Sequence, residues 1–284
     1  MYFKFPRRLL LLQLLFLIAS GCQKKMSIDG QLVIGVISYD EGEEIINRYA
    51  NFNKYLAKKT GAHIELEPAF NENKALERIQ NQAWSLVFAP PGLAAIAIAD
   101  YQYLPLFPLQ DLNHLRSILV VRNDSPIQEL KQLQGQKIAL GQVGSATGYY
   151  FPIYNLYGLT LAEILFAPTP KTVLQWVAQG KATAGGLSQA EFNLYIPQLS
   201  QTNFRVLYTD PHNVPPGVVL IAPIVERNLQ EQIRKIMSAA PANLIQETSY
   251  IPNAPIPDYK YMISVVERVK SIATQLNEKP TRLF

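Results

Sequence analysis

The sequence predicts an α/β fold of two lobes, each built on a parallel-rich sheet and joined to the other by two hinge strands. Two observations carry this prediction. Short apolar runs alternate along the chain with segments whose apolar residues recur every three or four positions, which is the pattern of strands alternating with helices. Two such α/β units follow one another within 284 residues, a length that suits one large domain or two small lobes.

The first unit begins with a continuous apolar run that predicts a buried strand. An amphipathic helix follows, and Gly61 is expected to end it as a C-cap. The pattern then repeats until Pro90, Pro91 and Gly92 break the third strand at its carboxyl end. The expected elements are strand 32–37, helix 45–56, strand 63–67, helix 73–82, strand 84–88 and the short helix 93–99.

The second unit starts after a strong apolar strand and contains a polar, glycine-containing loop. Its expected elements are strand 117–121, short helix 127–133, strand 137–140, loop 141–148, helices 149–156 and 172–179, and strands 183–187 and 204–208. The chain then returns through strand 218–222 and ends in two helices, 226–239 and 261–275.

These patterns predict the lobes and the connections between them. The first lobe is expected to comprise 31–117 plus 218–284, and the second lobe 118–217, with hinge crossings near 117–124 and 209–218. A cleft between two α/β lobes, lined by strand ends and helix starts, is a natural ligand site.

The N-terminus has the order of a secretory signal: basic, apolar, then small residues. It comprises Lys4, Arg7 and Arg8, the apolar residues 9–18, and the small residues 19–21 before Cys22. The apolar run is shorter than the ~20 residues of a membrane-spanning helix. We therefore expect residues 1–22 to be a signal peptide with a lipobox, lipid on Cys22, and a polar tether over 23–30. An uncleaved anchor helix is the alternative.

Composition and charge argue against several functions. The formal net charge of +4 includes three N-terminal cations, and subtracting them leaves +1 for the rest of the chain. That charge gives no support for nucleic-acid binding. The single cysteine, Cys22, excludes an intramolecular disulfide. The histidines His63, His114 and His212 show no metal-ligand spacing. No Gly-x-Ser-x-Gly or His-Glu-x-x-His motif occurs, and we expect no enzyme, no metal and no cofactor.

The most informative segment is 141–149, Gly-Gln-Val-Gly-Ser-Ala-Thr-Gly-Tyr, which lies between a predicted strand and a predicted helix. Backbone N–H groups at a helix start lack intrahelical partners and lie at the positive end of the helix dipole. Ser145 and Thr147 add hydroxyl donors, and Gly144 and Gly148 let a ligand approach the backbone. The segment fits a neutral anion cradle. A loop whose hydroxyls serve only to cap the helix is the alternative.

Residues 144–148, followed by aromatic residues and Pro152, resemble the Gly-Ser-Thr-Ser-Gly loop of the phosphate/phosphite/phosphonate-binding family of ABC importers. Further segments resemble the family in the same order, namely 35–40, 49–61, 88–92, 115–125 and 133–139. The resemblance covers residues 31–275 and rests on order and spacing. It implies a periplasmic-binding-protein-like fold of type II that closes on its ligand by hinge motion.

The resemblance also implies a function. It implies a monomeric solute-binding lipoprotein on the periplasmic or extracytoplasmic face of a bacterial membrane. Such a protein passes a small phosphorus oxyanion, a phosphonate, phosphite or phosphate, to ABC permease subunits. In the family, loop hydroxyls, loop amides and first-lobe tyrosines hold the phosphorus oxygens. The candidate ligand-binding residues are Tyr39, Pro90, Pro91, Gly92, Ser145, Ala146, Thr147, Gly148, Tyr149, Ser188 and His212.

Several positions depart from the family pattern. Ala146 replaces a hydroxyl residue, and Thr183 and Ser188 stand where aspartates are expected to hold a ligand ammonium. Glu191, one helical turn beyond Ser188, is expected on a solvated helix face. Fewer charged partners favour a less basic or more apolar ligand. A surface sensor, or a binder of a sulfonate or thiamine-pathway molecule on the same fold, therefore remains an alternative.

Overall fold

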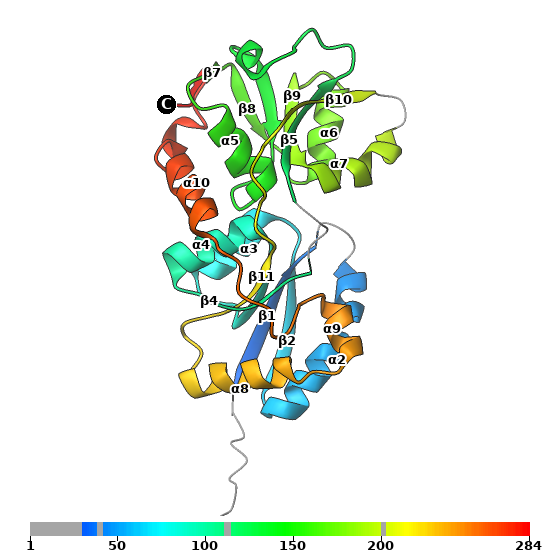
Figure 1. Cartoon of the computed structure of the whole chain (residues 1–284), viewed down its shortest axis with the longest axis vertical. Coiled ribbons are helices and arrows are strands. Elements are labelled where there is room, and N and C mark those ends of the chain that lie inside the picture. Colours follow the sequence, from blue (N-terminus) through cyan, green and yellow to red (C-terminus); the bar gives the residue numbers. More distant parts are fainter. Residues whose placement is uncertain (1–29, 39–41, 111–114, 200–202) are drawn as a thin grey trace, which may run out of the picture.

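The computed structural model describes residues 30–38, 42–110, 115–199 and 203–284, which form two lobes, each around a five-stranded sheet (Figure 1). We call the lobe around the lower sheet of Figure 1 the first lobe. Its strands are, in sheet order, β2 (His63–Ala69), β1 (Gln31–Ile37), β3 (Leu86–Ala89), β11 (Val218–Ile221) and β4 (Leu104–Pro108). Its helices are α2 (Gly42–Thr60), α3 (Glu72–Gln80), α4 (Pro91–Tyr101), α8 (Arg227–Ser238) and α9 (Ala242–Thr248).

The sequence explains the arrangement of the first lobe. β1 pairs in parallel with both β2 and β3, so it lies inside the sheet, as its continuous apolar run predicts. The helix α2 buries Tyr49, Phe52 and Leu56. The predicted C-cap is confirmed, because Gly61 has a φ of 78° and donates its N–H to the carbonyl of Ala57. β11 runs antiparallel to β3 and β4 because the chain enters it from the other lobe.

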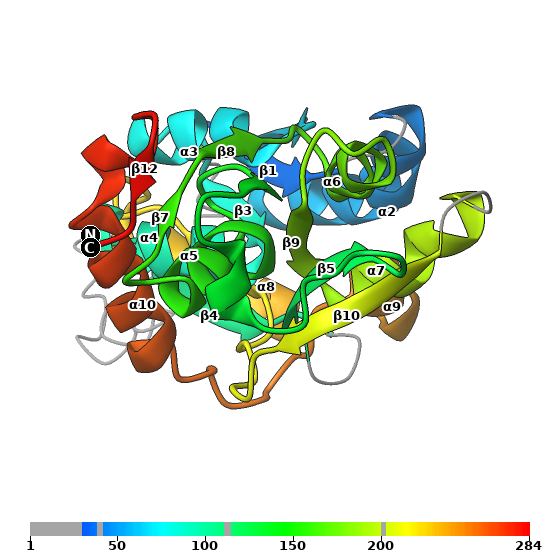
Figure 2. The same ribbon diagram turned by 90° about the horizontal axis from the view of Figure 1, so that it is seen from above.

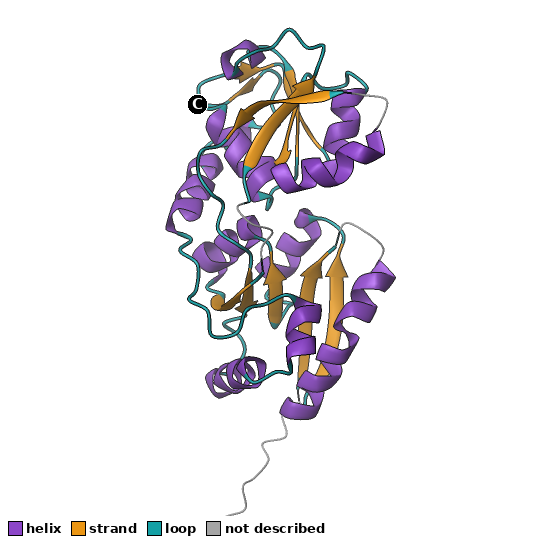
Figure 3. Ribbon diagram, turned by 45° about the vertical axis from the view of Figure 1, so that its right-hand side comes forward, coloured by secondary structure: helices purple, strands orange, loops and turns teal. Residues whose placement is uncertain are grey.

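The second lobe has the same construction (Figure 3). Its strands are, in sheet order, β10 (Phe204–Thr209), β5 (Ser117–Arg122), β9 (Ala184–Ser188), β6 (Lys137–Leu140) and β8 (Glu163–Phe166). Its helical segments are η1 (Leu130–Leu133), η2 (Ala146–Tyr150), α5 (Phe151–Asn155), α6 (Pro170–Ala178), α7 (Gln189–Tyr195) and η3 (Ile196–Leu199). β6 pairs in parallel with β8 and β9, whereas β5 and β10 pair antiparallel.

The predicted two-lobed α/β fold is therefore confirmed, but some elements were not predicted. β4 contains Pro105 and Pro108, which the sheet tolerates because β4 lies at its edge. Helices α7 and α9 have seven residues each, too few for a helical period to stand out in the sequence. No helix among the described residues combines the length and apolar content needed to cross a bilayer.

The C-terminal segment differs from the expectation that residues 218–284 belong to the first lobe. It comprises α10 (Lys260–Lys270), η4 (Ala273–Gln275) and β12 (Thr281–Arg282). Figures 1 and 2 show α10 beside α4 of the first lobe and α5 of the second, and the two helices contact it. β12 pairs with β7 (Thr160–Leu161), which follows α5. The apolar period of α10 predicts a helix but not the neighbour that buries it, so the sequence missed this third connection. The other lobe boundaries stay a prediction.

Candidate ligand-binding cleft

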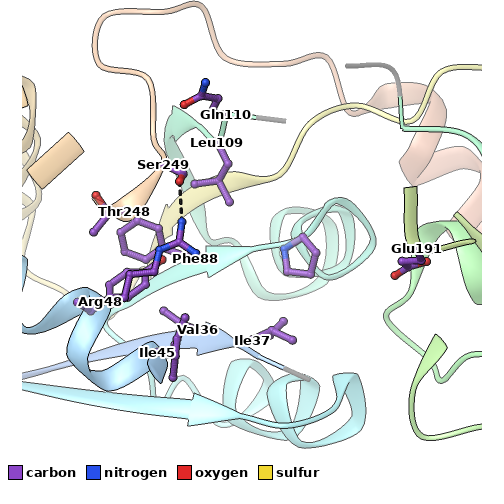
Figure 4. Close-up of a pocket in the computed structure, with 12 residues that line it drawn as sticks. Val36, Ile37, Ile45, Arg48, Phe88, Leu109, Gln110, Glu191, Thr248 and Ser249 are labelled. Atoms are coloured by element: carbon purple, nitrogen blue, oxygen red, sulfur yellow. Dashed lines mark hydrogen bonds between the residues drawn. The ribbon is translucent and has the colours of Figure 1, made fainter. Parts of the chain in front are cut away.

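A cavity of about 310 Å³ opens at the carboxyl ends of β1 and β3 and extends to α7 of the second lobe (Figure 4). Most of its wall is apolar and comes from the first lobe. The lining residues are Val36, Ile37, Ile45, Arg48, Tyr49, Phe88, Pro90, Leu109, Gln110, Thr248 and Ser249, with Glu191 from α7. Its volume falls in the ~300–1,000 Å³ range of small-molecule pockets.

A second, much smaller cavity lies in the second lobe beside the loop that resembles the anion cradle. It has room for about 10 Å³, close to the space of one water molecule. Its lining residues are Glu72, Gly141, Ser145, Gly148, Ala167, Pro168, Thr169, Pro170, Val173, Gly186, Leu187 and Glu191. Glu191 lines both cavities, so the small cavity and the large one adjoin at this side chain.

The loop before η2 is held by hydrogen bonds that begin a helical turn. The Ser145 hydroxyl accepts the N–H of Gly148 at 3.0 Å. The carbonyl of Ser145 accepts from the N–H groups of both Tyr149 and Tyr150, at 3.2 and 3.1 Å. The bond from the Tyr150 N–H spans five residues, which is the π-type spacing, so helical structure starts at Ala146 rather than at Tyr149 as predicted.

The candidate hydroxyls of this loop have different surroundings. Because Ser145 accepts in its capping bond, its own O–H proton is not used there and can be donated to another group. Thr147 is 4% exposed, and its backbone carbonyl accepts a 2.7 Å hydrogen bond from the Ser117 hydroxyl. Ala146 is also buried. The capping role of Ser145 is thus established by geometry, while contact with an anion stays a prediction.

Two helix starts of the second lobe face the small cavity. Ser145 caps η2, which continues directly into α5, and Thr169 caps α6 by accepting the N–H of Thr172 at 3.2 Å. Both capping residues line the cavity. The positive ends of two helix dipoles therefore point toward this cavity. Its lining residues include two carboxylates, Glu72 and Glu191, and no lysine or arginine.

Glu191 does not lie on a solvated helix face, as the sequence had suggested. Its Oε2 accepts the N–H of Ser188 at 2.8 Å, while the Ser188 hydroxyl accepts the N–H of Glu191 at 3.0 Å. This capping box turns the carboxylate back over the start of α7 and into the cleft. Burial raises the pKa of Glu191 because it removes water from the carboxylate, and the two bonds with Ser188 oppose that rise. Ser188 itself is 1% exposed and is engaged in the cap.

The Pro90–Gly92 turn lies where the first lobe meets the second. Pro90 lines the large cavity, and Pro91 begins α4. A Cβ atom on Gly92 would lie 2.1 Å from the carbonyl oxygen of Gly144 and 2.6 Å from the backbone nitrogen of Ala146. Gly144 has a φ of 111°, which a side chain would strain. Glycine is thus required on both sides of this interlobe contact.

His212 does not line either of these cavities, contrary to its place among the candidate residues. Its backbone N–H donates to Asp210 Oδ1 at 2.7 Å, and its Nδ1 lies 3.0 Å from the same oxygen. The Tyr261 hydroxyl is 3.2 Å from Nδ1, and the two rings stack with centroids 4.5 Å apart. His212 thus joins the returning hinge connection to α10.

The remaining candidates fall into two groups. Tyr149 is buried in an aromatic cluster with Tyr150 and Phe166, and burial raises the pKa of its hydroxyl to about 12. That packing is what an aromatic residue after a loop commonly does. Tyr39 and Cys22 lie outside the described residues, as do His114 and the signal segment.

The sequence missed a polar corner of the large cavity, which we define as Arg48, Gln110, Thr248 and Ser249. Figure 4 shows Arg48 and Ser249 joined by a hydrogen bond, 2.8 Å between Nη2 and Oγ. These residues come from α2, the end of β4 and the end of α9, and nothing in the sequence brings them together. Arg48 is one of several cations on an amphipathic helix, so no local pattern distinguishes it.

Comparison with solved structures supports the same fold. A Xanthomonas citri protein solved with bound chloride superposes with a TM-score of 0.69 at 18% identity, covering 85% of this chain and 99% of that one. PhnD1 from Prochlorococcus marinus, solved with methylphosphonate, has a TM-score of 0.65 at 17% identity, covering 85% and 99%. A binding protein component of an ABC phosphonate transporter from Pseudomonas aeruginosa has a TM-score of 0.65 at 14% identity, covering 88% and 89%.

A family model extends the comparison beyond the fold. The model described as "ABC transporter, phosphonate, periplasmic substrate-binding protein" matches residues 34–252, well over half of the chain. The match includes the ends of β1 and β3 and Pro90, which line the large cavity, and the Ser145 loop, which lines the small one. Members of the family are the extracytoplasmic components of ABC importers, and they bind a small ligand and work with permease subunits. This chain belongs to the family of periplasmic substrate-binding proteins of phosphonate ABC transporters.

Proposed function

We propose that the chain captures a small phosphorus oxyanion, foremost an organic phosphonate, between its lobes and delivers it to an ABC permease. The main support for this proposal is the Ser145 loop. It begins a helix at a cavity that a second helix start also faces, the Ser145 hydroxyl keeps its own proton for a ligand, and no lysine or arginine lines that cavity. Such a site suits an anion whose oxygens accept several hydrogen bonds at once. Phosphite and phosphate carry the same kind of oxygens and are tested beside the phosphonates.

Hinge closure accounts for the arrangement of the lobes. The ligand contacts the loop of the second lobe and the wall of the first, so it stabilises the state in which Gly92 and Gly144 touch. The small cavity beside Ser145 holds about 10 Å³, which is too little for a phosphonate group. The residues that line this cavity therefore have to rearrange around the ligand while Gly92 and Gly144 stay in contact.

Glu191 gives the site a means of choosing between protonation states. A carboxyl with a raised pKa can donate its proton to an oxyanion or, when ionised, accept a proton from a P–OH group. A fully ionised ligand beside an ionised Glu191 would be repelled. The site therefore favours the combination in which the ligand oxyanion and the Glu191 carboxylate share one proton.

The remaining features follow the sequence and the family. Lipid on Cys22 and the tether 23–30 would hold the binding protein at the membrane surface near its permease. We further propose that the protein acts as a monomer and performs no catalysis, since capture and release by hinge motion need neither a partner copy nor a nucleophile.

A thermal-shift screen of the full-length chain in mild detergent tests the proposal. The ligands are methylphosphonate, aminoethylphosphonate, phosphite, phosphate, sulfate, a sulfonate and ATP, the last because a Xanthomonas citri relative was solved with ATP. A ligand at a hundred times its dissociation constant stabilises the protein by about 2.7 kcal/mol. We expect a shift with a phosphonate and a weaker one, or none, with sulfate.

Ser145→Ala locates the site, with Ser125→Ala as the matched control. Both serines accept a backbone N–H, from Gly148 and from Ile127, but Ser125 lines neither cavity. Each variant loses a backbone-to-hydroxyl hydrogen bond worth about 1 kcal/mol of stability, so affinity is compared by calorimetry rather than by melting temperature. Loss of phosphonate binding in Ser145→Ala alone supports the proposal. A shift with sulfonate or ATP only, or none at all, contradicts it.

A further inference from the structure

The large cavity extends well beyond the Ser145 loop, and the inference drawn from it rests on the function proposed above. If the phosphorus oxygens are held beside Ser145 and Glu191, the cavity of about 310 Å³ is left for the rest of the ligand. Glu191 lines both cavities, so the two lie on either side of its side chain. A methyl substituent would fill only a small part of this space. The cavity therefore has room for a longer carbon chain.

The wall nearest Glu191 is apolar. In Figure 4 Ile37 lies between Glu191 and the polar corner. The rest of the apolar surface comes from Val36, Phe88, Pro90 and Leu109. Methylene groups gain about 0.8 kcal/mol each when such a surface removes them from water. A charged group half-way along the ligand would lose its water here without gaining a partner. The middle of the cavity thus suits a hydrocarbon linker.

The far end is polar and positively charged. The Arg48 Nε donates to the carbonyl of Glu247 at 2.6 Å, and its Nη2 donates to the Ser249 hydroxyl at 2.8 Å. Ser249 adopts a left-handed conformation with a φ of 55°, and its carbonyl accepts the N–H of Gln110 at 2.6 Å. These bonds fix the direction of the guanidinium before a ligand arrives.

The charge of Arg48 is not paired within the described part of the chain. Both of its described acceptors are neutral, a carbonyl and a hydroxyl. Arg48 uses two of its five guanidinium N–H donors in these bonds, so the other N–H groups can bind a ligand. A planar, oriented guanidinium matches a carboxylate, which can accept two parallel hydrogen bonds from it. Gln110 is exposed beside it.

We propose that the polar corner is a subsite for a second anionic group, and that the preferred ligand is a phosphonate whose carbon chain ends in a carboxylate. Arg48 is then the residue that determines specificity for the chain end. The Ser145 loop holds the phosphorus and Ile37 and Pro90 flank the linker. The arrangement disfavours aminoalkyl phosphonates, because their ammonium group would face a guanidinium.

The test compares the affinities of the full-length chain, in mild detergent, for four phosphonates by calorimetry: phosphonopropionate, propylphosphonate, aminoethylphosphonate and methylphosphonate. The first two differ mainly in the terminal carboxylate. A charge-assisted bidentate contact is worth about tenfold or more in affinity. We expect phosphonopropionate to bind at least that much more tightly than propylphosphonate, and aminoethylphosphonate to bind more weakly than methylphosphonate.

Three variants assign the effect to Arg48. Arg48→Gln should remove the preference for phosphonopropionate over propylphosphonate, and its thermal unfolding curve shows whether the variant is folded. Arg48→Lys should retain only part of the preference, because an ammonium cannot form the paired contact. Arg227→Gln removes the same charge from an exposed side chain on α8 and should change nothing.

The outcomes separate this inference from the proposed function. If methylphosphonate binds but the terminal carboxylate adds no affinity, the inference is wrong and the function stands. If Arg48→Gln weakens all four ligands equally, Arg48 holds the phosphorus group and the inference is wrong. If no phosphonate binds to the wild-type chain, the proposed function fails and the inference fails with it.

Discussion

Gly92 of α4 and Gly144 of the second lobe approach each other so closely that a Cβ on Gly92 would lie 2.1 Å from the Gly144 carbonyl oxygen. The contact joins elements of different lobes. A comparable clash occurs inside the first lobe, where a Cβ on Gly35 would lie 2.0 Å from the ring of the buried Trp84. A side chain is excluded at both positions, but only the clash at Gly92 can be relieved by moving the two lobes apart.

The first prediction contrasts these glycines. Gly92→Ala can be accommodated if the lobes move apart, so we expect phosphonate affinity to fall about tenfold or more with little change in the free energy of unfolding. Gly35→Ala cannot be relieved in this way, because β1 and Trp84 belong to one core. We expect it to lower the free energy of unfolding by about 1–3 kcal/mol.

Calorimetry and chemical denaturation of both variants measure the two quantities. The prediction would be wrong if Gly92→Ala destabilised the fold as much as Gly35→Ala did while keeping the wild-type affinity. In that case the contact between the lobes would be part of the folded core and not a contact that opens.

The second prediction concerns Glu191 and pH. Burial raises the pKa of Glu191 in the folded chain, so the folded state favours the neutral acid. The stability that the neutral Glu191 carboxyl contributes is fully present below its unfolded-state pKa of about 4.3. It is lost as the pH rises through the pKa of Glu191 in the folded chain. Glu191→Gln stays neutral and keeps an oxygen for the Ser188 N–H. The variant should therefore gain stability relative to the wild type as pH rises from 4 upward.

Glu163→Gln is the control with the opposite sign. Hydrogen bonds from Lys279 and Lys137 lower the pKa of Glu163. Its contribution to stability is present above the unfolded pKa and is lost as pH falls. Denaturation curves at several pH values should therefore show the two variants diverging from the wild type in opposite directions. Parallel pH profiles for both variants would contradict the prediction.

The third prediction concerns His212, which lies outside both cavities. Its ring stacks on Tyr261 and its Nδ1 faces Asp210. A residue that does not contact the ligand in either state contributes little differential binding. We expect His212→Ala to leave phosphonate affinity within about twofold while lowering the free energy of unfolding by about 1 kcal/mol, the usual size of one lost hydrogen bond.

Calorimetry at constant pH measures the affinity of His212→Ala, and Tyr261→Phe tests the hydroxyl on the other side of the contact. A tenfold loss of affinity in His212→Ala alone would place His212 in the binding site after all. It would also restore the expectation drawn from its position in the hinge connection.

The sequence by itself determined the elements and the loop that carries the family resemblance. Strands β1 and β6 stand out because apolar runs bury themselves between parallel neighbours, and α2 stands out because its apolar residues share one face. The Ser145 loop was recognisable because capping hydroxyls and glycines adjoin in the chain. Its hydrogen bonds, from Gly148 to Ser145, span only three residues, so local sequence suffices to indicate them.

The tertiary structure alone decided the long-range relationships. Arg48 meets Ser249 across about two hundred positions, Gly92 meets Gly144 across the lobes, and α10 contacts both lobes. Glu191 faces the cleft only because Ser188 turns its carboxylate back over the helix start. Periodicity states which face of an element is buried but not what covers it. Those partners depend on the relative placement of whole elements, which the packing of both lobes determines.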